Sequence, residues 1–160
     1  MKRTLIFLMI LGLSLCLTAP APAAAPRVPT SLCFEWGVLE DTTSLVIKKG
    51  SSVTMASGNV SYYNLSGKHL IPRATPITVP IIGTGYVQGN VFHFSFTGAA
   101  AFDAGSGLQT HSLSVDGSWD LVAHTGSINY HWSLPTDGIE AINAVDCKTV
   151  SSLQAAGANP

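Results

Sequence analysis

Residues Gly83 to Phe96 read Gly-Thr-Gly-Tyr-Val-Gln-Gly-Asn-Val-Phe-His-Phe-Ser-Phe, and this stretch decides the fold class. Two runs of β-favouring residues flank Gly89-Asn90, a pair typical of a tight turn. In the second run, phenylalanines alternate with smaller or polar residues, which is the period of a strand buried on one face. The stretch therefore predicts a β-hairpin with an aromatic inner face.

A second hairpin of the same layout is predicted from Gly117 to Leu134, with its turn at His124 to Gly126. Its second run alternates large apolar residues with polar ones, the apolar members being Ile128, Tyr130, Trp132 and Leu134. Because the two hairpins repeat one scheme, we interpret the remaining runs as parts of the same sheet.

The other expected strands are Leu32–Leu39, Thr43–Lys48, Ser52–Ala56, Val60–Leu65, a long bent strand Ile77–Val87, and His111–Asp116. Turns are expected at 49–51, 57–59, 66–68 and 116–117, with an irregular segment at 69–80 and a flexible connection at 97–107. In 139–150 we expect a short turn or helix, followed by a strand that contains Cys147.

About nine or ten short strands and no long helix indicate an all-β, antiparallel meander. Such a meander forms a small closed or nearly closed β-barrel, with a two-sheet β-sandwich as the alternative. The barrel is favoured because a bond between Cys33 on the first strand and Cys147 on the last would bring the two ends of the sheet together.

The first 23 residues have the three-part layout of a secretory signal peptide, with cleavage expected after Ala23. We then expect a Pro/Ala-rich linker at 24–30, one β-barrel domain at 31–150 and a disordered tail at 151–160. The protein is therefore expected to be secreted or periplasmic. A lipoprotein anchored through Cys16 is the alternative, although Leu15 stands where a small residue would be expected.

Cys33 and Cys147 are the cysteines that remain after this processing. In an exported chain, such a pair predicts a disulfide. It would close a loop of about 115 residues, for which chain entropy gives nearly 5 kcal/mol as an upper value.

The processed chain has a formal charge of about −3 and no cluster of basic residues, which argues against a nucleic-acid partner. The apolar run of the leader, from Leu5 to Leu17, is shorter than the roughly 20 residues of a membrane-spanning helix, so no stable span is expected after its removal.

The sequence has none of the motifs examined for a catalytic or metal site: it lacks a Gly-x-Ser-x-Gly elbow, a phosphate-binding loop and a metal-binding motif. His93 and His131 hold matching positions in the two hairpins and would approach each other if their strands were neighbours, with His111 or His124 as a further metal ligand. A solvated outer face accounts for both histidines more simply, and we expect neither a metal nor a cofactor.

The aromatic residues of the strands are the most informative candidates for function. A barrel of about eight strands can pack its interior with aromatic rings or leave room for one small ligand. The ligand-binding candidates are Trp36, Tyr86, Trp119, Tyr130 and Trp132. The expected function is binding of a small apolar or amphipathic ligand without catalysis; the alternatives are a ligandless envelope or surface interaction module and a barrel enzyme of lyase or isomerase type.

An exported meander that carries Gly117-Ser118-Trp119 is similar in layout to the calycin group of ligand-binding barrels, such as lipocalins and avidins. The similarity is confined to these three residues, so no residue role is carried over from those families.

Overall fold

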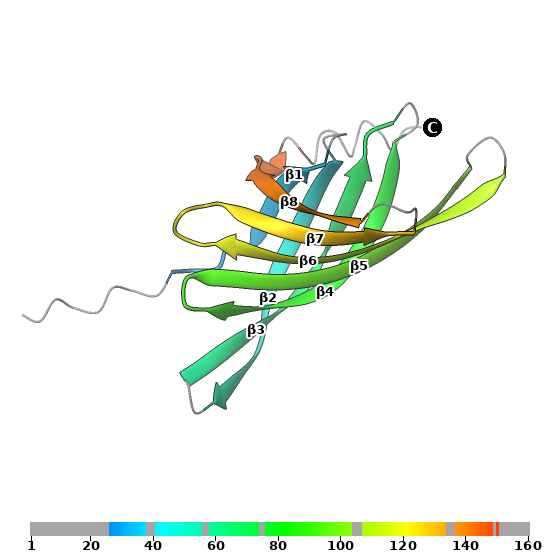
Figure 1. Cartoon of the computed structure of the whole chain (residues 1–160). Helices are drawn as coiled ribbons and strands as arrows, with labels where there is room; N and C mark the ends of the chain where they lie inside the picture. Colours follow the sequence, from blue (N-terminus) through cyan, green and yellow to red (C-terminus); the bar gives the residue numbers. More distant parts are fainter. Residues whose placement is uncertain are drawn as a thin grey trace, which may run out of the picture.

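The structure is a computed structural model, and it describes residues 26–37, 41–55, 58–73, 76–103, 107–133, 137–148 and 150. The predicted signal peptide and the predicted tail lie outside these residues. Within them the chain forms eight strands (Figure 1): β1 Ser31–Trp36, β2 Asp41–Met55, β3 Gly58–Ile71, β4 Ile77–Gln88, β5 Val91–Asp103, β6 Leu108–Asp120, β7 Gly126–Trp132 and β8 Asp137–Ala144.

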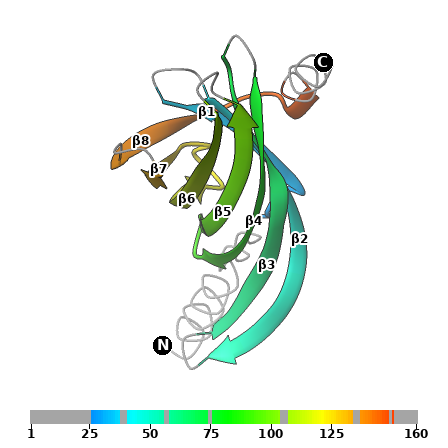
Figure 2. The same cartoon turned by 90° about the vertical axis from the view of Figure 1, so that its right-hand side faces the viewer.

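The eight strands form one antiparallel meander that closes into a ring. Each strand pairs with the next along the chain, and β1 also pairs with β8, through Phe34 with Ala144 and Glu35 with Asn143. Figure 2 shows the strands curving around one interior. The predicted all-β closed meander is confirmed and the two-sheet sandwich is not formed; we refer to the ring as the barrel.

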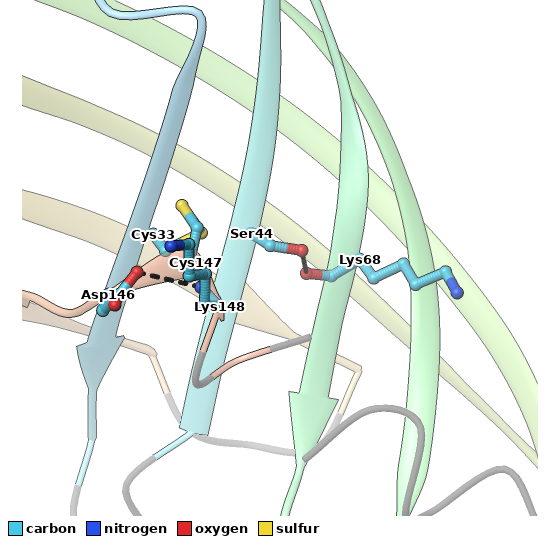
Figure 3. The surroundings of a disulfide bond; sticks show 6 residues. All are labelled: Cys33, Ser44, Lys68, Asp146, Cys147 and Lys148. Atoms are coloured by element: carbon cyan, nitrogen blue, oxygen red, sulfur yellow. Dashed lines mark hydrogen bonds between the residues drawn. A yellow bond between two sulfur atoms is a disulfide. The ribbon is translucent and has the colours of Figure 1, made fainter. Parts of the chain in front are cut away.

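The predicted disulfide is also present. Cys33 on β1 and Cys147, which follows β8, have Cα atoms 5.2 Å apart (Figure 3). Beside this bond, the Val145 amide donates a hydrogen bond to the Cys33 carbonyl oxygen (2.9 Å). The disulfide therefore reinforces the place where β1 and β8 meet, at which the ladder has only two residue pairs.

The hairpin predicted at Gly83 to Phe96 is confirmed as the end of β4 and the start of β5. Gly89, in the turn, has a φ of 60°, a backbone conformation that suits glycine. Phe92, Phe94 and Phe96 all face the interior and are at most 3 % exposed. The Phe94 ring also lies 5.9 Å from the Phe34 ring of β1, so the aromatic face of this hairpin is the centre of the core.

Several predicted turns are wrong, because the strands are longer than expected. The segments 49–51, 66–68 and 116–117 lie inside β2, β3 and β6, and much of the predicted connection at 97–107 belongs to β5. At 49–51 the strand instead has an irregular register with β3. In place of nine or ten short strands, the described chain has eight strands, most of them long.

The glycines that suggested turns serve close packing between strands. A Cβ on Gly67 would collide with the Ser44 backbone of β2, and a Cβ on Gly117 would collide with the Phe94 ring. Glycine inside a strand commonly marks such a close approach.

The predicted order of elements in 139–150, a turn or helix followed by a strand, is reversed in the structure. The strand β8 comes first, and Cys147 lies in a helical turn after it, in which the Val150 amide donates to the Asp146 carbonyl oxygen (3.3 Å). The reason is ring closure: the segment from Asp137 has to pair with β7 and reach β1 before the chain turns to place Cys147 beside Cys33.

The barrel interior has two parts. One part is apolar and filled, with the buried residues Phe34, Leu45, Leu65, Ile81, Phe92, Phe94, Phe96, Val115, Trp119, Ile128 and Ile142 in a single cluster. The other lies at the end where β1–β2, β3–β4, β5–β6 and β7–β8 are connected, toward the top and right in Figure 1, and it contains the polar groups of the inner face. We refer to this end as the site end.

Candidate functional site

The site end brings together polar and aromatic side chains from six strands. Trp36 ends β1, Asp41 and Thr43 begin β2, His69 lies near the end of β3, His111 lies in β6, Tyr130 and Trp132 lie in β7, and Glu140 lies in β8. Each takes an inward position in the alternation of its strand, as the registers of Thr43 with His69 and of Ile128 with Glu140 show.

A chain of hydrogen bonds connects three of these residues. Trp36 Nε1 donates to Thr43 Oγ1 (2.9 Å), and Thr43 Oγ1 lies 2.9 Å from His69 Nδ1. Thr43 is fully buried. Among the described residues, the acceptor within reach of the Thr43 hydroxyl proton is His69 Nδ1. The proton of the neutral imidazole is therefore assigned to Nε2.

The protonated Nε2 of His69 faces Asp41. Nε2 and Asp41 Oδ2 are 3.8 Å apart, which is beyond hydrogen-bond range. Within the described part of the chain, both His69 Nε2 and Asp41 Oδ1 are buried without a hydrogen-bond partner. A donor and an acceptor thus stand side by side, with neither bond made.

Burial sets the charge state of this pair. Desolvation lowers the pKa of His69 to about 3, so the ring is neutral over the physiological range. Desolvation raises the pKa of Asp41 to about 6; the positive charge of Arg73 opposes this effect and the negative charge of Glu140 adds to it. Asp41 is therefore a carboxyl group that titrates close to neutral pH.

His111 contributes a second buried imidazole. Its ring stacks on Phe102 with centroids 4.5 Å apart and meets Trp132 edge-on at 5.9 Å. Burial, and then the charge of Arg73, lower the pKa of His111. Its Nδ1 has no hydrogen-bond partner among the residues described.

Tyr130 and Glu140 complete the site. The Tyr130 hydroxyl donates to Glu140 Oε1 (3.0 Å), and desolvation, followed by this hydrogen bond, raises the pKa of Tyr130. The Tyr130 ring lies 4.9 Å from Trp36. This hydrogen bond aligns an aromatic ring beside the His69–Asp41 pair.

The structure divides the five predicted ligand-binding residues among three places. Trp36, Tyr130 and Trp132 meet at the site end, with the Trp36 ring 4.9 Å from Tyr130 and 6.0 Å from Trp132. Trp119 is 3 % exposed and packs in the apolar part of the core. Tyr86 is 39 % exposed on the outer face, where its ring stacks on His93.

The prediction from sequence misses the polar half of the site. It places Asp41 just beyond the end of a strand and His69 in an irregular segment. The missed signal is the period of two through Leu65, Gly67, His69 and Ile71, which continues β3 once Gly67 is taken as a strand residue.

The two histidines considered for a metal site lie apart. His93 on β5 and His131 on β7 are separated by β6, and His131 Nδ1 instead pairs with Asp137 Oδ1 at the surface (3.2 Å). In the described ranges, no group of three or more His, Cys, Asp or Glu side chains is placed to hold a metal ion.

No family model, curated protein or solved structure matches the chain. Across the residues that the structure covers, no helix is long and apolar enough to span a membrane. The fold and the site together define an eight-stranded, ring-closed antiparallel meander that has a polar and aromatic cluster at one end.

Proposed function

We propose that this protein is an exported, non-enzymatic barrel that binds a small amphipathic ligand at the site end. One observation carries the proposal: the buried Nε2–H of His69 and the buried Oδ1 of Asp41 lack partners among the described residues, beside three converging aromatic rings. A ligand with a polar group that both accepts and donates would complete both bonds.

Unmade hydrogen bonds in a buried site cost free energy. A buried polar group without a partner costs about 1–3 kcal/mol, and a bound molecule that supplies the missing partner recovers that free energy. Tyr130 and Trp132, which are only partly buried, offer ring surface for the rest of such a molecule. The packed phenylalanines of the core favour a position at the end of the barrel over one in its middle.

The proposed compartment is extracytoplasmic. The disulfide supports it, because such bonds persist in oxidising compartments, and the signal-peptide layout of the leader agrees. The mass of the processed protein tests this: an N-terminus at Ala24 supports export with cleavage, whereas an acylated Cys16 identifies a lipoprotein.

Ligand binding is tested by titrating the processed protein with decanol, decanamide and phenol, whose polar groups both accept and donate hydrogen bonds, while following tryptophan fluorescence. At least one probe should bind saturably, because Trp36 and Trp132 report on the site. His69→Gln should weaken that binding by about tenfold. His131→Gln, the same change at an exposed histidine that pairs with Asp137 on the outer face, is the matched control and should bind as the unmodified protein does.

Two results would count against ligand binding: no response to any of the three probes, or equal affinities for the two histidine variants. Either would favour the ligandless interaction module. If His69→Gln fails to fold, Trp36→Phe replaces it, since this change keeps a ring and removes the Nε1–H that bonds Thr43.

One observation favours a second candidate, an enzyme of lyase or isomerase type. A buried carboxyl group with a pKa of about 6 has the properties of a general acid or base. If a bound probe is recovered chemically changed, and Asp41→Asn abolishes the change while retaining binding, the protein is an enzyme.

A further inference from the structure

A second candidate binding surface, in which aromatic and polar side chains lie side by side, is on the outer face of β3–β6, away from the site end. Here the registers place residues in two parallel rows across the strands. The first row is aromatic and consists of Tyr62, Tyr86 and His93; the second is polar and consists of Asn64, Thr84, Ser95 and Asp116. Successive rows on one face of a sheet are about 7 Å apart.

The aromatic row forms a continuous platform. The Tyr86 ring stacks on His93, with centroids 4.9 Å apart and planes 21° from parallel, and the Tyr62 ring follows at 6.4 Å. Tyr86 remains 39 % exposed. Since His93 covers one face of the Tyr86 ring, the exposed surface of Tyr86 lies on its other face and its edge.

A hollow of about 300 Å³ lies between the aromatic row and three members of the polar row, Thr84, Ser95 and Asp116. The core beneath it is closely packed: a Cβ on Gly85 would collide with the Phe92 ring, and a Cβ on Gly117 with the Phe94 ring. The strands that carry the two rows are thus fixed before any ligand arrives, which lowers the cost of binding.

We propose that this outer surface binds a carbohydrate. A sugar ring has a C–H face, which packs on an aromatic ring, and an edge of hydroxyl groups. The members of the polar row that line the hollow offer that edge a carboxylate and two hydroxyls at one row's distance from Tyr86. The surface is independent of the site end, so this inference holds whether or not the proposed function does.

The test uses the processed protein with three soluble oligosaccharides as probes: chitotriose, maltohexaose and xylohexaose. Binding is followed by backbone amide chemical shifts in NMR spectra. At least one probe should shift the amides of β4 and β5 around Tyr86 and His93. Tyr86→Ala should weaken this binding by about tenfold, whereas Tyr86→Phe, which keeps the ring, should retain it.

Asp116→Asn should weaken binding severalfold, because it replaces an ionised acceptor of sugar hydroxyls with a neutral amide. Leu108→Ala is the matched surface control, since Leu108 is 79 % exposed at the start of β6, eight residues along the strand from Asp116. The proposal is overturned if none of the three sugars binds or if Tyr86→Ala binds as the unmodified protein does. It is also overturned if tetramethylammonium occupies the Tyr86 platform more tightly than every sugar, because the surface would then be a cation site.

Discussion

Thr43 connects two buried rings through a single hydroxyl, which accepts from Trp36 and donates to His69. Thr43→Val keeps the shape of the side chain but leaves both ring nitrogens unpaired. We expect a loss of about 2–4 kcal/mol in the free energy of unfolding, measured by urea denaturation. Thr42→Val is the control: the Thr42 hydroxyl is buried and has no partner among the described residues, so its removal should be neutral or stabilising. Equal losses in the two variants would contradict the hydrogen-bond chain.

The Asp41 and His69 side chains have opposite effects on stability as the pH changes. Between about pH 6.5 and pH 3, His69 is protonated in the unfolded state and neutral in the folded state. The free energy of unfolding therefore falls as the pH falls through this range. Asp41 has a folded pKa of about 6, above its ordinary value of 3.8, so the folded state binds the extra proton and gains stability as the pH falls from 6 to 4. The two contributions therefore oppose each other in that range.

The variant Asp41→Asn separates the pH-dependent contribution of Asp41 from that of His69. The stability of the unmodified protein relative to this variant should rise by at most about 2 kcal/mol on going from pH 6 to pH 4. Denaturation curves at the two pH values measure the difference, in which groups common to both proteins cancel. A difference that is independent of pH would show that the Asp41 carboxyl is not desolvated.

At the level of the strands, glycine has two different roles that look alike in the sequence. Gly89 lies in a turn with positive φ and open space around it, whereas Gly117 lies inside β6 against the Phe94 ring. Gly117→Ala should therefore cost well over 2 kcal/mol through overpacking, and Gly89→Ala about 1 kcal/mol through backbone strain. Thermal unfolding of both variants provides the comparison; similar losses would mean that Gly117 is not closely packed.

The same ambiguity determines how far the structure could be predicted from the sequence. The alternation of Phe92, Phe94 and Phe96 is sufficient for the hairpin, because large apolar residues at a period of two are typical of a strand buried on one face. Gly67 and Gly117 suggest turns, since the sequence does not show which neighbouring strand comes close. The aromatic half of the site follows from alternation. The polar half does not, because His69 becomes an inward strand residue only once Gly67 joins β3.

For the molecule as a whole, the weakest connection in the ring is the one that closes it. The ladder between β5 and β6 extends from Val91–Asp120 to Asp103–Leu108, whereas β1 and β8 share only two residue pairs. The Cys33–Cys147 disulfide lies beside that short ladder and closes a loop with a sequence separation of 114. The disulfide therefore provides most of the constraint that holds β1 beside β8.

Replacing both cysteines with alanine should lower the free energy of unfolding by several kcal/mol, up to about 5. Hydrogen exchange should show where the loss begins: the Val145 amide, bonded to the Cys33 carbonyl oxygen, should lose protection first, while β5 and β6 amides keep theirs. Intact mass provides the control, because reduction of the unmodified protein should add two hydrogens. Unchanged stability, or a uniform loss of protection across all strands, would show that the backbone ladder alone closes the ring.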